Sequence, residues 1–431
     1  MRNGAKSQTI FLTAVNALVR AMGLCLRVFL SRTLGAEIMG IAELAQSVHM
    51  LFITPLTSGL PLAISRVTAK ADQADREKPL LAAISLVRLS AALLIPMLLL
   101  FSPLLARLMG DIRVLPSLWS SAPCILILGY SAAYNGYCYG VERSRIPALS
   151  ELIEQSARFA VCVALIALLP GLTAPWAAAV PVFSTMVAEV LGLLFVAAVL
   201  RIPVEGLEAA AAWKKPILRL AAPTTITRLL STLLRSLSAI VIPLRLRASG
   251  LTAAEATARL GLLNGMVTPI LMLPCIFTSA LTMVTLPKIA RCEDDPPALK
   301  RILLQCLYAS VPVAALSWAA VDLSAPYLAV RLYRMAELTE LFHLAAPLTL
   351  LFAFSHVSGG VVAALGQQKR SLYGAAPASV LTLELTWVLA ADPALRLKGV
   401  VYAQEIGQGA LILWNALVLL WWRRKRRAHT R

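Results

Sequence analysis

The chain has 431 residues, of which 59% are hydrophobic and only 14% charged, and its net charge at pH 7 is +18. This composition excludes a soluble enzyme, because apolar runs longer than the ~18 residues that mark a membrane-spanning helix recur along the chain. The seven cysteines form no Cys-x-x-Cys or Cys/His cluster, so neither a metal site nor a disulfide framework is predicted. We therefore expect an all-helical polytopic membrane protein that carries no cofactor.

Short connections separate the apolar segments, and none is large enough to hold a catalytic domain. We predict an N-terminal six-helix lobe over 1–201, a cytoplasmic linker over 202–215, a C-terminal six-helix lobe over 216–422 and a basic cytoplasmic tail over 423–431. The twelve predicted spans are 10–31, 41–65, 80–106, 117–140, 149–169, 176–200, 216–244, 260–286, 302–322, 341–364, 372–391 and 399–422.

The first span contains two arginines, Arg20 and Arg27, whose seven-residue spacing places them about 20° apart on a helix. A charge at that depth costs at least ~2.5–3.5 kcal/mol, so each arginine needs a polar surround. The span that opens the second half repeats the spacing with Arg228 and Arg235. We expect these four guanidinium groups to line a cationic cavity between the two halves, suited to the pyrophosphate of an anionic substrate.

The alternative for the four arginines is structural pairing with intramembrane acids such as Glu43 or Glu384, or snorkelling to an interface. Those acids are also candidates for ion coupling. Glu154 and Arg158 lie four residues apart on one helix face, where an ion pair is the simplest expectation and a cavity or coupling role the second.

An internal repeat relates the two halves. Residues 40–70 align without gaps with 261–291, residues 140–143 resemble 366–369, and the two arginine pairs align as well. We interpret the halves as parallel repeats. The second and eighth spans both contain helix breakers, which predict a moving, cavity-lining element, with a static kink as the alternative. The predicted gating breaks are Pro55, Gly59 and Pro61 in the second span and Pro269 and Pro274 in the eighth.

The distribution of lysine and arginine predicts the topology. Of the 40 Lys and Arg residues, 24 lie in the connections and tail on the N-terminal side, 10 lie in the connections on the opposite side, and six lie within spans. Both termini are therefore expected to face the cytoplasm. The net positive charge is explained by cytoplasmic loops and the tail, which would lie against anionic lipid headgroups rather than nucleic acid.

The N-terminal region is similar to a known family. The run Ser31-Arg-Thr-Leu-Gly-Ala, followed by Gly40-Ile41 and by Thr57-Ser-Gly-Leu-Pro-Leu-Ala-Ile-Ser-Arg66, resembles the stage V sporulation protein B branch of polysaccharide-biosynthesis proteins. That branch belongs to the multidrug/oligosaccharidyl-lipid/polysaccharide exporter superfamily, which includes the lipid II flippases. Glu154-Gln155 with Arg158 in the fifth span supports the resemblance.

The resemblance implies two six-helix lobes that form a V around a central cavity, in a monomer of the bacterial cytoplasmic membrane. It implies a flippase that moves an undecaprenyl-pyrophosphate-linked saccharide by alternating access, with a cell-wall precursor, a polysaccharide unit or spore cortex material as its cargo and an ion gradient or the membrane potential as a driving force. Arg20 matches a cavity arginine of the lipid II flippases and Arg27 lies one residue from their second. Their acidic residue at the start of the second span falls on Ile41 here, with Glu43 two places on.

Other functions remain open. A cation-coupled drug exporter of the same superfamily would need a cavity dominated by acids and aromatics. A membrane glycosyltransferase or polymerase would show a longer external loop with catalytic residues, and no such loop or nucleotide-binding motif is present. A major-facilitator transporter would carry a charged, glycine-rich signature that residues 68–79 lack.

Overall fold

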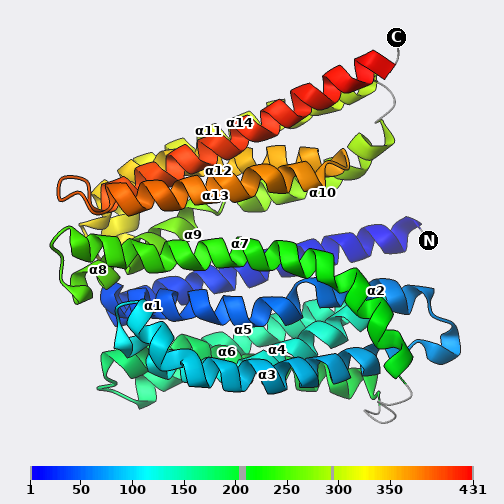
Figure 1. Cartoon of the computed structure of the whole chain (residues 1–431), viewed down its shortest axis with the longest axis horizontal. Coiled ribbons are helices and arrows are strands. Elements are labelled where there is room, and N and C mark those ends of the chain that lie inside the picture. Colours follow the sequence, from blue (N-terminus) through cyan, green and yellow to red (C-terminus); the bar gives the residue numbers. More distant parts are fainter. Residues whose placement is uncertain (1, 203–209, 293–295, 430–431) are drawn as a thin grey trace. The chain divides into compact units, whose positions relative to one another are not determined.

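The computed structural model describes residues 2–202, 210–292 and 296–429, and the regular elements in these ranges are all helices (Figure 1). They pack into two compact units, unit 1 over Met1–Ser236 and unit 2 over Leu237–Arg431, so that the division falls inside one long helix. The lobe boundaries expected from the sequence stay a prediction. Of the predicted linker 202–215, residues 203–209 lie outside the described residues, as do the last two residues of the predicted tail.

Unit 1 contains the first six predicted spans and the N-terminal part of α7. Short connections join α2 to α3, α3 to α4, α4 to α5 and α5 to α6, and α4 and α6 pack closely together, as do α5 and α6. Its long helices are α1 (Arg2–Thr57), α2 (Gly59–Lys70), α3 (Lys78–Leu108), α4 (Leu115–Gly140), α5 (Arg145–Leu168), α6 (Ala174–Leu200) and the start of α7 (Lys214–Ala248).

Helix α1 consists of two spans that reverse direction at Gly35. Gly35 has φ 78° and ψ 175°, a conformation that a residue without a Cβ adopts readily. In a straight helix Arg27 and Glu43 would be ~24 Å apart. Their side chains instead form an ion pair with 2.9 Å between Nη1 and Oε1. The reversal therefore separates the spans that the sequence predicts at 10–31 and 41–65.

Unit 2 contains the C-terminal part of α7, the last five predicted spans and two π-helical segments. The two segments are joined by a hydrogen bond of 2.9 Å from the Tyr333 hydroxyl to the Met266 carbonyl, and the ring of Tyr333 stacks on Phe342 with centroids 6.2 Å apart. The elements are α8 (Ala253–Leu260), the π-helix Gly261–Val267, α9 (Thr268–Leu271), α10 (Cys275–Arg291), α11 (Pro296–Tyr327), the π-helix Leu328–Tyr333, α12 (Leu338–Ala364), α13 (Gln368–Leu389) and α14 (Leu397–His429).

Nine helices among the described residues are long and apolar enough to cross a membrane by length and composition alone. One of them, Phe11–Lys70, has 60 residues and would be ~90 Å long, three times the ~30 Å hydrocarbon core, and it contains the reversal at Gly35. Helix α5 has the length of a span but carries several charges, and the eighth predicted span is divided among the π-helix Gly261–Val267, α9 and α10. Together these helices account for the twelve predicted spans.

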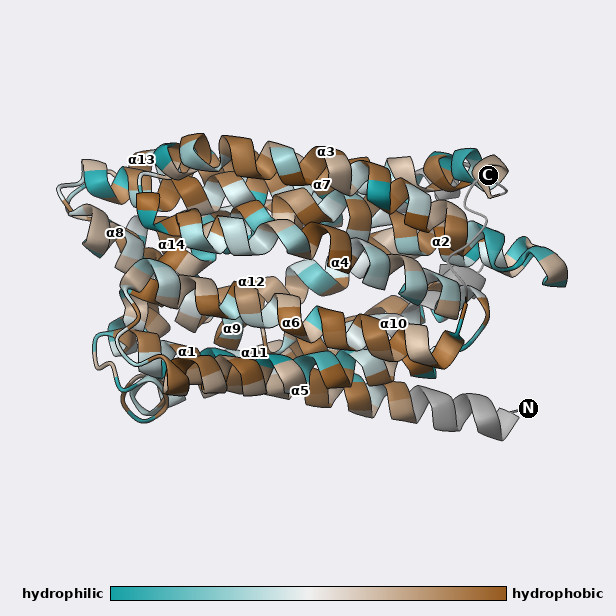
Figure 2. Ribbon diagram, turned by 90° about the horizontal axis from the view of Figure 1, so that it is seen from below, coloured by the Kyte–Doolittle hydropathy of each residue, from teal (hydrophilic) through white to brown (hydrophobic). Residues whose placement is uncertain are grey.

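The outward faces of the helices are apolar, as a lipid environment requires. Large side chains such as Leu100, Leu168 and Leu323 are 75%, 76% and 82% exposed. Figure 2 shows hydrophobic residues along the helices and hydrophilic residues in the loops at their ends. A soluble protein rarely leaves so many large apolar side chains in contact with water. The chain is therefore a multi-pass membrane protein.

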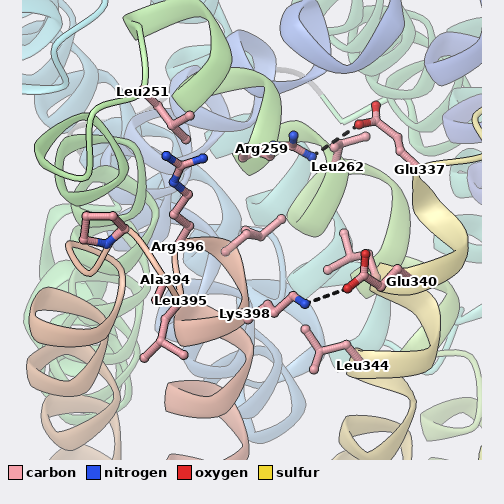
Figure 3. A pocket seen from close by; sticks show the side chains of 13 residues that line it. Leu251, Arg259, Leu262, Glu337, Glu340, Leu344, Ala394, Leu395, Arg396 and Lys398 are labelled. Atoms are coloured by element: carbon pink, nitrogen blue, oxygen red, sulfur yellow. Dashed lines mark hydrogen bonds and ion pairs between the residues drawn. The ribbon is translucent and has the colours of Figure 1, made fainter.

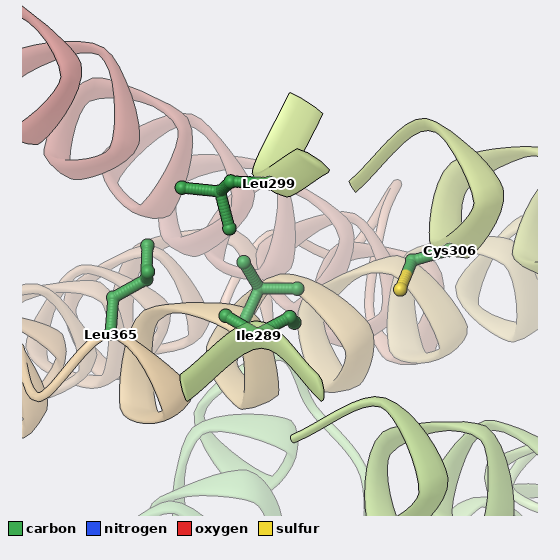
Figure 4. Close-up of a cluster of buried hydrophobic side chains, with 5 residues drawn as sticks. Ile289, Leu299, Cys306 and Leu365 are labelled. Atoms are coloured by element: carbon green, nitrogen blue, oxygen red, sulfur yellow. The ribbon is translucent and has the colours of Figure 1, made fainter. Parts of the chain in front are cut away.

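Inside each unit, apolar side chains from different helices meet. In unit 2, Ile289 of α10 packs with Leu299 and Cys306 of α11 and with Leu365 at the end of α12 (Figure 4). This cluster joins three consecutive long helices, so it fixes α10 against its neighbours at the end of the helix that follows the predicted break.

Candidate functional site

The first span of α1 packs along α5 through a buried apolar stripe. Val19 and Leu26 belong to this stripe, and Val15 and Val19 contact Ala148 of α5. At 100° per residue, Arg20 and Arg27 lie about 100° from the centre of the stripe. The two arginines therefore border the α1–α5 contact on the same side of α1.

The two arginines of the first span differ in their surroundings. Arg20 is exposed and lies within electrostatic range of Glu151 on α5. Arg27 is 36% exposed and forms the ion pair with Glu43, which is 18% exposed. For Arg27 the structure thus shows the pairing with an intramembrane acid that the sequence left as the alternative to substrate contact.

A second charged group lies between α5 and α6. Glu154 and Glu189 are 8% and 7% exposed, and the Arg158 guanidinium lies 3.8 Å from the Glu189 carboxylate. The Ser150 hydroxyl donates a hydrogen bond of 2.7 Å to Glu154 Oε1. One arginine therefore faces two buried carboxylates, and a buried charge needs such partners because its desolvation cost is large.

The ion pair within α5 that the sequence suggested, between Glu154 and Arg158, is replaced by the pair of Arg158 with Glu189. The reason lies in the packing of α5 on α6. A Cβ on Gly192 would overlap Oε1 of Glu154 and lie 2.5 Å from its Cγ. Gly192 thus leaves the space on α6 that the Glu154 side chain fills, while Arg158 reaches Glu189 one turn earlier on α6.

Two buried nitrogens near this group have no hydrogen-bond partner in the described part of the chain: Nδ1 of His49 and Nε of Arg158. Arg158 also lies within electrostatic range of His49 and Glu151. The charged group thus reaches from α5 and α6 to the second span of α1. The Arg158 Nε–H is a donor that a water molecule or an anion could satisfy, whereas Nδ1 of His49 donates or accepts according to the tautomer of the ring.

Arg228 and Arg235 lie on α7 within unit 1, and both side chains are exposed. The second span of α1 and α7 are joined by hydrogen bonds from Thr54 Oγ1 to Thr232 Oγ1, 3.3 Å, and from Ser236 Oγ to the Ser47 carbonyl, 2.7 Å. On the helical wheel the two arginines lie about 40–100° from these contacting residues of α7. They therefore border the seam between α7 and α1.

The predicted helix breaks are present, but their places differ between the repeats. In unit 1 the helix is interrupted at Ser58, between Pro55 in the last turn of α1 and Pro61 in the first turn of α2. In unit 2 the interruption covers residues 272–274, between α9, which has Pro269 in its first turn, and α10, whose N-cap is Pro274. The sequence alignment of 40–70 with 261–291 would put this second break some six residues later.

Gly59 begins α2 where this helix closely approaches α7. A Cβ at position 59 would overlap the Ala221 carbonyl oxygen and the Thr225 hydroxyl. The break in the second span is therefore held against α7 by backbone contact. Whether it acts as a gate stays a prediction.

The remaining predicted acid, Glu384, lies on α13 in unit 2 with an exposed side chain. Sequence reasoning missed Glu151, which the structure places near both Arg20 and Arg158. A signal for it was present, because Glu151 precedes Arg158 by seven residues and therefore lies on nearly the same line of α5.

Comparisons with known proteins show relatives of the chain in sequence and in fold. The family model described as polysaccharide biosynthesis protein matches residues 5–293. The chain is 24% identical to stage V sporulation protein B of Bacillus subtilis (strain 168) over 424 residues, which are 95% of this chain and 82% of that protein.

Solved transporter structures share the fold. An inward-facing multidrug-resistance MATE family transporter of the MOP superfamily has a TM-score of 0.75 at 17% identity, covering 95% of this chain and 94% of that one. The lipid II flippase MurJ in its inward closed conformation has a TM-score of 0.73 at 14% identity, covering 94% and 87%. Because the family model matches well over half of its residues, the chain belongs to the polysaccharide biosynthesis protein family.

Proposed function

We propose that the protein is a flippase that moves a saccharide linked to a polyprenyl pyrophosphate across the bacterial cytoplasmic membrane by alternating access. The observation that carries this proposal is the set of intramembrane arginines Arg20, Arg228 and Arg235, whose side chains are exposed in a chain of this family. An exposed guanidinium inside a membrane span requires a polar partner. A pyrophosphate supplies one, because its oxygens accept the paired hydrogen bonds of the planar guanidinium.

The proposal also covers the orientation of the protein in the membrane and the energy source for transport. Both termini face the cytoplasm, because the connections on that side carry most of the lysine and arginine. The group of Glu154, Arg158 and Glu189 is proposed to couple transport to a proton or a cation, because two buried carboxylates share one guanidinium. In this proposal the protein moves its cargo without changing the cargo's covalent structure.

A cation-coupled drug exporter of the same superfamily is the second candidate. The acids Glu43, Glu151, Glu154 and Glu189 in the helices of unit 1 favour it, since they would attract a cationic cargo. The two candidates differ in the expected effect of removing arginines. Loss of Arg20 or Arg228 weakens transport of an anionic cargo, whereas it leaves transport of a cationic drug unchanged or improves it.

The test uses the purified full-length protein in liposomes that contain a polyprenyl-pyrophosphate saccharide. Transport is measured per folded protein for Arg20→Ala, Arg228→Ala and the double variant, with Arg88→Ala as control, since Arg88 is an exposed arginine of α3 that bonds to Tyr130. Each single change removes a charged hydrogen bond of roughly 1.5–3 kcal/mol, so a ten- to hundredfold loss is expected.

Replacement by lysine should also lower transport, because lysine keeps the charge but loses the planar fork. Full transport by the double alanine variant would refute the role of these arginines. Mass spectrometry of the recovered lipid would refute the transporter itself if it showed that the protein alone extends or cleaves the saccharide.

A further inference from the structure

A pocket lies at one end of unit 2, where four separate segments of the chain meet. Its volume is about 300 Å³, and it is lined by Leu251 before α8, by residues of 259–262, by residues of 337–344 at the start of α12 and by the turn 393–398 between α13 and α14 (Figure 3). Leu262 belongs to the π-helix Gly261–Val267, whose Met266 carbonyl accepts the hydrogen bond from the Tyr333 hydroxyl. A volume of this size is at the lower end of the range for small-ligand sites.

The charges that line the pocket do not cancel. Arg259 pairs with Glu337 at 3.3 Å and Lys398 pairs with Glu340 at 2.6 Å. Arg396 is the third basic group on the wall, and in Figure 3 its side chain extends toward Leu251, away from both ion pairs. The pocket therefore carries one net positive charge.

One acid outside the lining, Glu255, lies within electrostatic range of Arg396. Its carboxylate already accepts hydrogen bonds of 2.8 Å from the backbone N–H and the hydroxyl of Thr252, in the capping box that begins α8. The guanidinium of Arg396 has no ion pair among the described residues that line the pocket.

The backbone of Arg396 adds a second argument. Its φ of 46° lies in the left-handed region, where a side chain with a Cβ is disfavoured and glycine is comfortable. Such strain is typical of positions at which the side chain serves a binding site. Arg334 adopts the same conformation, with φ 58°, at the end of the neighbouring π-helix, but it does not line the pocket.

The rest of the wall is apolar, and the position of the pocket at the helix ends is where we expect the membrane interface. The pocket is formed by helix ends and turns, where spanning helices meet the phospholipid headgroups. Six leucines alternate with the charged residues: Leu251, Leu262, Leu341, Leu344, Leu395 and Leu397. A ligand that fits this wall combines an anionic group with an apolar body.

We propose that this pocket binds the headgroup of an anionic phospholipid, with the phosphate on Arg396 and the glycerol region against the leucines. The planar guanidinium makes paired hydrogen bonds to phosphate oxygens, and the net charge of the pocket selects an anionic headgroup over a zwitterionic one. This site binds a lipid of the surrounding membrane and does not depend on which cargo the protein carries.

The experiment titrates the full-length protein, in a neutral detergent, with water-soluble dihexanoylphosphatidylglycerol and measures binding by calorimetry. The test variant is Arg396→Gly, which removes the guanidinium and relieves the backbone strain, so the melting temperature should not fall. The matched control is Arg334→Gly, which makes the same change in the same conformation outside the pocket. Inorganic phosphate and dihexanoylphosphatidylcholine serve as the comparison ligands.

We expect saturable binding of the phosphatidylglycerol, about tenfold or more weaker in Arg396→Gly and unchanged in Arg334→Gly. Binding of both comparison ligands should be weaker, since one lacks the apolar body and the other carries a compensating cation. Absence of saturable binding, or an equal loss in both variants, would overturn the site. Inorganic phosphate binding as tightly as the lipid would show a free-oxyanion site instead, and equal binding of phosphatidylcholine would overturn the selectivity.

Discussion

A charged side chain inside the membrane can pair with a residue on a neighbouring helix even when a residue of opposite charge lies on the same helix. Arg158 lies one turn from Glu154, yet it pairs with Glu189 across the α5–α6 contact. Glu154 meanwhile occupies the space over Gly192 and accepts a hydrogen bond from Ser150. Two carboxylates with one arginine leave a place for one more positive charge, which is the physical basis of the coupling proposal.

Two substitutions test the role of Glu154 in different ways. Glu154→Gln removes the charge, and Gly192→Ala displaces the Glu154 side chain, because its new Cβ would overlap the Oε1, Cγ and Cδ atoms of Glu154. We expect both to abolish the stimulation of transport by a proton or sodium gradient, reducing the rate to that without a gradient. Gly409→Ala, whose Cβ would meet nothing within 4 Å, is the control. Stimulation that persists in both test variants would exclude Glu154 from coupling.

At the scale of the elements, helix breaks and close backbone contacts occur together. The break at Ser58 is followed at once by Gly59, where α2 approaches the backbone of α7 too closely for any side chain. A proline or glycine alone does not specify such a contact; the partner helix must be in place. The break is therefore part of the packing of α2 against α7.

Gly59→Ala should destabilise the protein by about 1–3 kcal/mol, because the new methyl group overlaps the Ala221 carbonyl and forces the two helices apart. Gly23→Ala is the opposite case, since its Cβ would meet nothing within 4 Å and alanine favours the helix by roughly 0.5–1 kcal/mol. The melting temperatures of the two purified variants should move in opposite directions. A Gly59→Ala protein as stable as the natural one would show that the contact is not maintained in the membrane.

At the scale of the whole molecule, the helices of each unit alternate in direction, so their loops form two ends. In unit 1 the N-terminal end of α1 and the loop after α2 lie on the same side (Figure 1). At the other end, Arg113 is held by Asp111 at 2.9 and 2.7 Å and by Glu37. The loops on the N-terminal side carry the excess of lysine and arginine, which supports the proposed orientation.

Labelling of single cysteines in a cysteine-free background tests this orientation. A membrane-impermeant maleimide added outside intact cells should react with cysteines placed beside Gly171 and Arg331. Cysteines at Lys214 and Lys369 should react only after the membrane is permeabilised, because the proposed orientation places these positions on the cytoplasmic side. Labelling of the Lys214 position from outside would reverse the orientation.

The membrane-spanning helices can be predicted from the sequence because a lipid environment allows an apolar segment few backbone structures other than a helix. Backbone groups in lipid must be paired within the helix, so a long apolar run has one structure available. The predicted span 80–106 accordingly corresponds to α3 (Lys78–Leu108), and 176–200 to α6 (Ala174–Leu200). The partner of Arg158 and the place of the second helix break depend on contacts between helices, which a linear pattern does not contain.

The turn at Gly35 has a consequence for how the protein enters the membrane. Because Gly35 is the one residue with non-helical φ and ψ inside α1, the connection between the first two spans is short, and we expect both helices to leave the insertion machinery together as a hairpin. Arg27 and Glu43 then enter the bilayer as an ion pair already formed. The pairing thereby reduces the insertion cost of ~2.5–3.5 kcal/mol that each charge would carry alone. The two charged side chains of this hairpin are then already paired at the first step of assembly.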